Sequence, residues 1–155
     1  MGVEIERKFL LRDNSWQAQA DQGTHFRQGY LSSAGPGSVR VRIEGEQAKL
    51  NIKSATLDMH RLEYEYPIPL ADAHQMLDQI CIKPLIDKIR YHVMHAGKLW
   101  EIDVFSGDNQ GLVVAEVELR SRDEQIDLPD WAGAEVTHDK RYYNVSLVRH
   151  PYRDW

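Results

Sequence analysis

Charged side chains occupy every second position along most of this chain, and this alternation constrains the fold more than any other feature. In residues 2–11, for example, Glu4, Glu6 and Lys8 stand between apolar side chains. Because successive side chains of a strand point to opposite faces, the pattern predicts strands with one charged and one apolar face. The same pattern recurs in residues 38–45, 48–54, 60–68, 87–95, 98–105 and 112–120.

An eighth strand is expected at residues 25–32, and glycine-containing turns separate most of the strands. Three short helices are expected at residues 14–20, 70–82 and 138–149, the last with Thr137 as its N-cap. The order of elements predicts a mainly β protein of the α+β class. We expect an eight-stranded antiparallel closed β-barrel with a few flanking helices, because eight antiparallel strands can close. Residues 1–149 form this single domain, and residues 150–155 after Pro151 are expected to be a loose tail.

Like charges repeat two positions apart on these strands, which distinguishes them from ordinary solvated strands. For any single strand a solvated face is the simpler interpretation. Like charges about 6.5–7 Å apart nevertheless gain nothing structurally. Acidic pairs suit divalent cations, and basic pairs suit phosphate oxygens, so an inward-facing set predicts a polar tunnel for a metal–polyphosphate complex. The pairs are Glu4/Glu6, Glu63/Glu65, Glu101/Asp103, Glu116/Glu118, Arg40/Arg42 and Lys88/Arg90.

Composition limits the partners and the cellular compartment that we expect for this protein. The 155 residues carry a net charge of −5, which argues against a surface devoted to nucleic acid. The single cysteine, Cys81, excludes an internal disulfide and fits a reducing compartment. An apolar run long enough for a membrane helix is absent, as is a signal peptide, so we expect a cytoplasmic protein without nucleic-acid or membrane partners. Helices, or the second subunit of a homodimer, would cover the apolar outer face.

Nine ordered segments make the sequence similar to the CYTH domain, or triphosphate tunnel metalloenzyme, family, and especially to its short bacterial inorganic triphosphatases. The resemblance implies an eight-stranded tunnel that acts on triphosphates with Mg²⁺ or Mn²⁺. It covers nearly the whole chain, and the final helix would cap one tunnel mouth. The matching segments are Glu4–Lys8, Arg27–Leu31, Val39–Arg42, Lys53–Ser54, Arg61–Glu65, Asp87–Tyr91, Glu101–Phe105, Glu116–Glu118 and Glu135–Asn144.

The resemblance also suggests roles for individual side chains. Arg61 is equally expected to pair with a neighbouring carboxylate, and Tyr30 is equally expected to be a packed barrel tyrosine. Lys140 is expected more often to lie on the surface than to touch the substrate. Candidates for phosphate binding are Lys8, Arg40, Arg42, Lys53, Arg61, Lys88, Arg90 and Lys140. Candidates for metal binding are Glu4, Glu6, Asp103, Glu116 and Glu118. Candidates for catalysis are Tyr30, Lys88, Arg90, Glu63 and Glu65.

Three functions are compatible with these residues. The leading hypothesis is metal-dependent hydrolysis of tripolyphosphate to pyrophosphate and phosphate. The second is an enzyme for organic triphosphates, either a thiamine triphosphatase or a class IV adenylyl cyclase. The central strands hold no tryptophan between Trp16 and Trp100, which favours the inorganic substrate. The third is a non-catalytic polyphosphate-binding module, although binding alone would need the basic residues more than the paired carboxylates.

Overall fold

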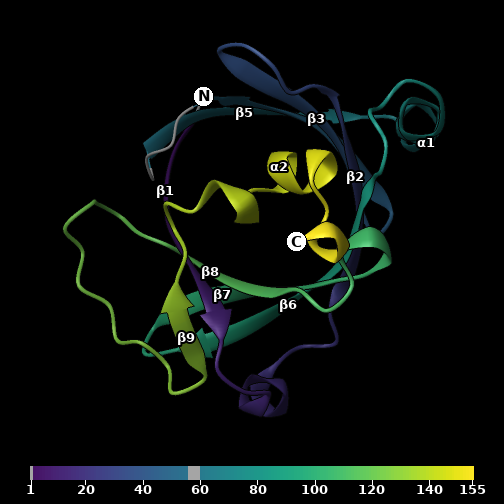
Figure 1. Ribbon diagram of the computed structural model, residues 1–155. Helices are drawn as coiled ribbons and strands as arrows, with labels where there is room; N and C mark the ends of the chain where they lie inside the picture. The colour runs from purple at the N-terminus through teal and green to yellow at the C-terminus, as the bar shows by residue number, and fades with distance from the viewer. Residues whose placement is uncertain (1, 56–59) are drawn as a thin grey trace.

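The computed structural model describes residues 2–55 and 60–155, and within them one antiparallel sheet closes on itself (Figure 1). Eight strands follow one another in the order β5-β4-β3-β2-β6-β7-β8-β1, and β1 then pairs with β5 to complete the ring. The predicted eight-stranded barrel is therefore confirmed. Its strands are β1 (Gly2–Leu11), β2 (Thr24–Ser32), β3 (Gly37–Glu44), β4 (Gln47–Ser54), β5 (His60–Ile68), β6 (Ile86–His95), β7 (Lys98–Phe105) and β8 (Val113–Glu118).

A further short strand, β9 (Ala132–Glu135), was not predicted from the sequence. Residues 2–5 of β1 pair with β5, whereas Phe9 and Leu11 pair with β9 along the same edge. The strand therefore extends this edge of β1 beyond the point where β5 ends. Its sequence, Ala-Gly-Ala-Glu, has too few large apolar side chains to give an alternating pattern.

Strand register brings the charged side chains onto one face. In the β6–β7 hairpin, Ala96 and Gly97 both have positive φ, as the tight two-residue hairpin turn requires. This turn pairs His95 with Lys98 and so places Arg90 directly opposite Asp103. A one-residue slip would turn these charges to the apolar outer face, so the turn helps to define the lumen.

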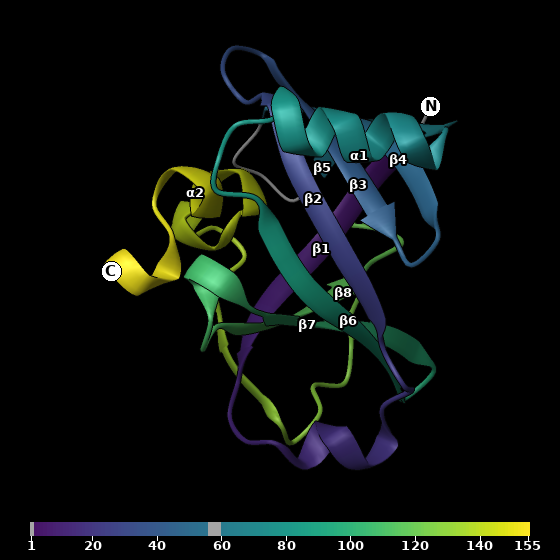
Figure 2. The ribbon, with the colours of Figure 1, turned by 90° about the vertical axis from the view of Figure 1, so that its right-hand side faces the viewer.

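Two of the three apolar clusters lie on the outer face of the barrel. Helix α1 (Leu70–Gln79) covers β3 and β4, with Ala73 and Leu77 fully buried (Figure 2). The short 3₁₀ helix η1 (Ser15–Gln19) brings Trp16 into the other outer cluster, which also contains Trp100 and Trp131. Packing of Trp16 and Trp131 against the barrel exterior is therefore confirmed, and Cys81 is buried just beyond the end of α1.

The C-terminal segment closes one end of the barrel with the third apolar cluster (Figures 1 and 2). It comprises η3 (Lys140–Tyr142), α2 (Asn144–Arg149) and η4 (Tyr152–Asp154). Leu147 and Val148 of α2 pack against Ile86 and Phe105, which extend the inward face of β6 and β7. We call this C-terminal segment, residues 140–155, the plug.

The plug differs from the predicted single helix with a loose tail. Asp139, rather than Thr137, accepts a hydrogen bond at a helix start, and Tyr143 has an extended backbone that separates η3 from α2. Thr137 instead accepts a hydrogen bond from the backbone of Lys8. The tail is packed, because Trp155 contacts the ring of Tyr142 at 5.0 Å between centroids. Across residues 2–55 and 60–155, none of the helices has the length and apolar character needed to cross a membrane.

Candidate active site

A polar cavity of about 250 Å³ occupies the lumen of the barrel. Every predicted site residue except Lys140 and Asp103 lines it, so side chains from β1 to β8 converge as the alternation predicted. The lining also includes five residues that were not assigned roles from the sequence: Ser38, Glu101, Tyr143, Asn144 and Val145. Of these, Glu101 belongs to a predicted acidic pair, and Tyr143 and Asn144 belong to the last matching segment.

Guanidinium groups from β3 and β6 crowd one side of the cavity. Burial, followed by the charges of Arg40 and Arg90, lowers the pKa of Arg42 to about 10. Arg40 is only 5% exposed, and within the described chain its Nε has no hydrogen-bond partner. Unpaired buried donors are costly, so this side of the cavity is built to receive an anion.

Asp103 lies beneath the cavity and holds two cations in place. Arg90 donates to both its oxygens, at 2.7 and 2.9 Å, and Lys88 Nζ donates to Oδ2 at 2.8 Å. Although burial opposes its charge, these two partners hold the pKa of Asp103 well below its usual range. In this arrangement both oxygens of Asp103 are engaged by Arg90 and Lys88, and its role as a metal ligand stays a prediction.

Lys88 is completely buried, and its environment weakens its charge. Burial and the neighbouring Arg90 and Arg42 lower the pKa of Lys88 to about 7, against the opposing effect of Asp103. The ammonium lies between the rings of Phe26 and Phe105, 5.8 and 5.5 Å from their centroids. An anion in the cavity would favour the charged form of this lysine.

Carboxylates from β1 and β8 crowd the opposite side. The predicted closeness of these strands is confirmed, with Glu6 opposite Glu118 in the β1–β8 register. Burial, then the charges of Glu116 and Glu4, raises the pKa of Glu6 to about 8. Burial also raises the pKa of Glu118, as do several nearby glutamates. Hard divalent cations would relieve this repulsion, so the carboxylate donors suit a cation of this kind.

Lysines balance part of this acidic side. Lys8 Nζ lies 3.5 Å from Glu116. Burial alone would raise the pKa of Glu116, but the charges of Lys8 and Arg90 outweigh this effect and lower the pKa to about 2. Lys53 Nζ lies 2.9 Å from Glu4 and 3.7 Å from Glu63. In this arrangement, no three acidic, histidine or cysteine side chains of the described residues are grouped closely enough to enclose a cation.

For Arg61, Lys140 and Tyr30, the surrounding residues bear on whether each side chain can reach a ligand in the cavity. The guanidinium of Arg61 stacks over the ring of Tyr143 at 4.9 Å. Lys140 is exposed and lines a separate depression of about 280 Å³ beside Arg61 and Tyr143, rather than the main cavity. Tyr30 is 5% exposed and lines the main cavity, while its ring belongs to the apolar cluster of the plug.

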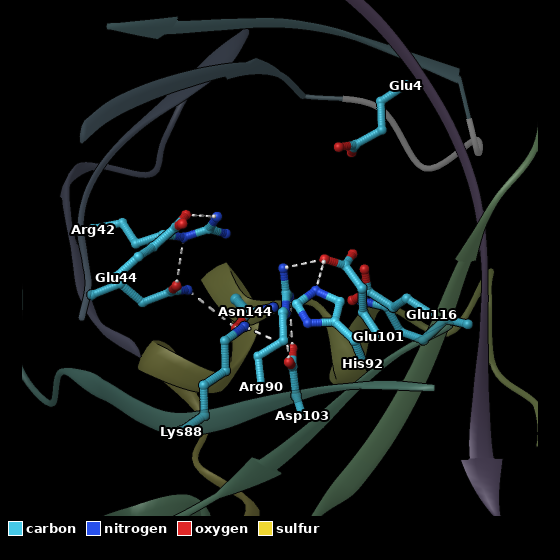
Figure 3. Close-up of polar contacts among 12 residues, drawn as sticks. Glu4, Arg42, Glu44, Lys88, Arg90, His92, Glu101, Asp103, Glu116 and Asn144 are labelled. Atoms are coloured by element: carbon cyan, nitrogen blue, oxygen red, sulfur yellow. Dashed lines mark hydrogen bonds and ion pairs between the residues drawn. The ribbon is translucent and has the colours of Figure 1, made fainter. Parts of the chain in front are cut away.

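A hydrogen-bonded network joins the basic side chains at the base of the cavity (Figure 3). Arg42 Nε donates to Gln28 Oε1 at 3.1 Å, and Gln28 Nε2 donates to Asn144 Oδ1 at 3.2 Å. Lys88 Nζ donates to the same Asn144 oxygen, also at 3.2 Å. The alternation of charges could not reveal Gln28 or Asn144, because both are neutral.

The exposed end of this network involves a histidine. His92 Nδ1 lies 3.1 Å from Asp21 Oδ2, and its Nε2 lies 3.6 Å from Glu101 Oε2. Glu101 in turn accepts a hydrogen bond from Arg90 at 3.3 Å. His92 therefore supports the wall of the cavity next to Arg90.

Comparison with known proteins agrees with this geometry. The sequence model of the CYTH domain matches residues 2–152. The inorganic triphosphatase of Acetivibrio thermocellus is 43% identical over 155 residues, covering 100% of this chain and 99% of that protein. The inorganic triphosphatase of Nitrosomonas europaea is 35% identical over 150 residues, covering 94% and 97%.

Solved structures show the same barrel. A crystal structure of an inorganic triphosphatase has a TM-score of 0.67 with 34% identity, covering 94% of this chain and 97% of that one. A plant protein from Hippeastrum, described as a putative adenylyl cyclase with dominant triphosphatase activity, has a TM-score of 0.59. At 15% identity, with 76% and 80% of the two chains covered, it shares the fold alone.

Proposed function

The chain belongs to the CYTH domain family, and on that premise we propose that it hydrolyses inorganic triphosphate to pyrophosphate and phosphate in its lumen. The observation that carries this proposal is the division of one enclosed cavity into a guanidinium-rich side and a carboxylate-rich side. A triphosphate–metal complex has matching negative and positive parts. The inorganic triphosphatases among its relatives support the choice of substrate.

The basic side would bind and orient the phosphate chain. Arg40 offers a buried donor that lacks a partner within the described chain, and Arg42 lies beside it on the same strand. An anion between them relieves the repulsion that lowers the pKa of Arg42. Lys8, Lys53 and Arg61 line the same cavity and would contact the rest of the phosphate chain, while Lys140 lies outside this cavity.

The acidic side would hold Mg²⁺ or Mn²⁺ through Glu4, Glu6, Glu116 and Glu118. When bound there, the cation would neutralise phosphate charge and polarise the P–O bonds. Glu63 or Glu65 would orient a water molecule and accept its proton as the water oxygen attacks the terminal phosphorus. Lys88 and Arg90 would stabilise the negative charge that builds on the departing pyrophosphate oxygen. Tyr30, almost fully buried and lining the same cavity, is a further candidate proton acceptor.

The decisive test is phosphate release from tripolyphosphate, ATP and thiamine triphosphate in the presence of Mg²⁺, Mn²⁺ or EDTA. We expect fast release from tripolyphosphate that EDTA and Glu4→Gln abolish. Glu46→Gln, an exposed carboxylate in the β3–β4 turn, is the matched control and should retain activity. Preference for an organic substrate would contradict the proposed specificity. Tight binding without turnover would contradict the enzymatic function and favour a polyphosphate-binding module.

The cellular setting remains a proposal as well. We infer a cytoplasmic protein that binds neither nucleic acid nor membranes. Homodimerisation stays a prediction, and light scattering of the purified protein measures it directly.

A further inference from the structure

We propose that Asn144 is a positioning residue for the triphosphate site: it orients the ammonium group of Lys88 toward the cavity. The proposal rests on the proposed function, because the ligand that Lys88 would contact is the triphosphate. Asn144 is the first residue of α2, so the plug itself would supply part of the binding geometry.

The first argument is the number of donors on Lys88. An ammonium group carries three N–H donors. Asp103 Oδ2 and Asn144 Oδ1 accept hydrogen bonds from Nζ at 2.8 and 3.2 Å. Lys88 also lines the cavity. With two donors directed to fixed partners, the third is left for an oxygen atom in the cavity.

The second argument is that Asn144 is neutral. Asp103 orients Lys88 but also cancels part of its charge, and it already receives two bonds from Arg90. Asn144 constrains the same ammonium without adding a negative charge close to the phosphates. A carboxylate at position 144 would repel the substrate, whereas an apolar side chain would leave Lys88 free to turn.

The third argument is that Asn144 connects two cations on different strands. Its Oδ1 also accepts from Gln28 Nε2, and Gln28 Oε1 accepts from Arg42 Nε. Gln28 is completely buried, so its amide has little freedom to rotate. Figure 3 shows Asn144 reaching from α2 toward Lys88, with Arg42 on the same side of the lumen. Asn144 Oδ1 therefore links Lys88 of β6 directly, and Arg42 of β3 through Gln28, in one hydrogen-bonded network.

The test compares binding of tripolyphosphate in EDTA, measured by calorimetry, so that inactive variants also give a value. Asn144→Leu removes the acceptor while keeping the branched side chain with the same number of heavy atoms. A hydrogen bond to a charged group is worth enough to weaken binding roughly ten- to a hundredfold. Arg149→Ala is the matched control on the same helix, because Arg149 anchors α2 to Ser33 without entering the cavity. It should bind like the parent.

A double-mutant cycle separates positioning from structural damage. If Asn144 acts through Lys88, Asn144→Leu should change binding less than about twofold in a Lys88→Met background. An equal loss in both backgrounds, or no loss in the parent, would overturn the proposal. Thermal unfolding checks that each variant folds, and Asn144→Ala replaces the leucine variant if that one does not.

The same data distinguish this proposal from the assigned function. A parent protein that neither binds nor hydrolyses tripolyphosphate would refute the proposed function. A parent that does both, while Asn144→Leu binds equally well, would refute only the role of Asn144.

Discussion

Glu6 should destabilise the cation-free protein at alkaline pH, and its replacement by glutamine should remove this effect. Burial and the neighbouring carboxylates of Glu116 and Glu4 raise its pKa from the ordinary 4.5 to about 8. Because the pKa of Glu6 is higher in the folded than in the unfolded protein, its protonated form adds to the free energy of unfolding. This stabilisation is fully present below pH 4.5 and is lost as the pH rises through 8. Glutamine is neutral throughout and nearly isosteric.

The magnitude follows from the width of this interval. At 1.36 kcal/mol per pH unit, the interval from 4.5 to about 8 corresponds to about 4 to 5 kcal/mol. Neighbouring carboxylates titrate together and share this cost. We therefore expect the free energy of unfolding of Glu6→Gln to exceed that of the parent by at least about 2 kcal/mol at pH 9. At pH 4.5 the two proteins should have similar free energies of unfolding.

Urea unfolding in EDTA at several pH values measures this difference. The more exposed Glu65→Gln variant, from the same cavity, is the matched control and should follow the parent. Mg²⁺ or Mn²⁺ should stabilise the parent more at pH 8 than at pH 6, because a cation favours the ionised carboxylate. Equal unfolding free energies of Glu6→Gln and the parent at pH 9 would refute the reasoning.

Three further changes separate binding from stability. Arg40→Met should weaken tripolyphosphate binding in EDTA by about tenfold or more, because it removes a buried donor. It should not lower the unfolding temperature, because it also eases the repulsion on Arg42. Unchanged affinity in calorimetry would contradict this role. Asp103→Asn should lower the unfolding free energy by about 3 to 5 kcal/mol in urea titrations, since Lys88 and Arg90 would lose their buried partner; a loss below about 1 kcal/mol would count against it. Leu77→Ala should lower the free energy of unfolding by about 2 to 5 kcal/mol in the same titrations, while kcat stays at the parent value, because Leu77 packs under α1 outside the barrel. A reduced kcat in the folded variant would contradict this separation of the outer shell from the lumen.

Local patterns were sufficient to predict most of the barrel and its charged face. The turn at Ala96 and Gly97 even determines that Arg90 faces Asp103, so this ion pair could have been inferred from hairpin register. The metal-ligand prediction for Asp103 considers its spacing from Glu101 within one strand, and the opposite strand adds the contacts with Arg90 and Lys88. The closure of the ring between β1 and β5 depends on contacts about 60 residues apart, so the alternation within single strands does not specify which strands meet there.

The plug was harder to predict. The extended backbone of Tyr143 interrupts the helix, and the ring contacts of Trp155 with Tyr142 and Tyr152 hold the tail that follows Pro151. Asn144 lies in the last segment of the family resemblance but has no predicted role, because neutral amides occur in many turns and helix starts. Its hydrogen bonds become apparent only when α2 is placed over the lumen.

The arrangement of apolar side chains outside the ring separates what holds the barrel together from what it binds. Two of the three clusters lie against the outer wall, under α1 and around Trp100, while the third seals the end beside α2. Side chains that face the cavity can therefore be exchanged without removing much of this packing. Selection could alter the charges of the lumen, and with them the ligand, while the same outer shell continued to specify the fold.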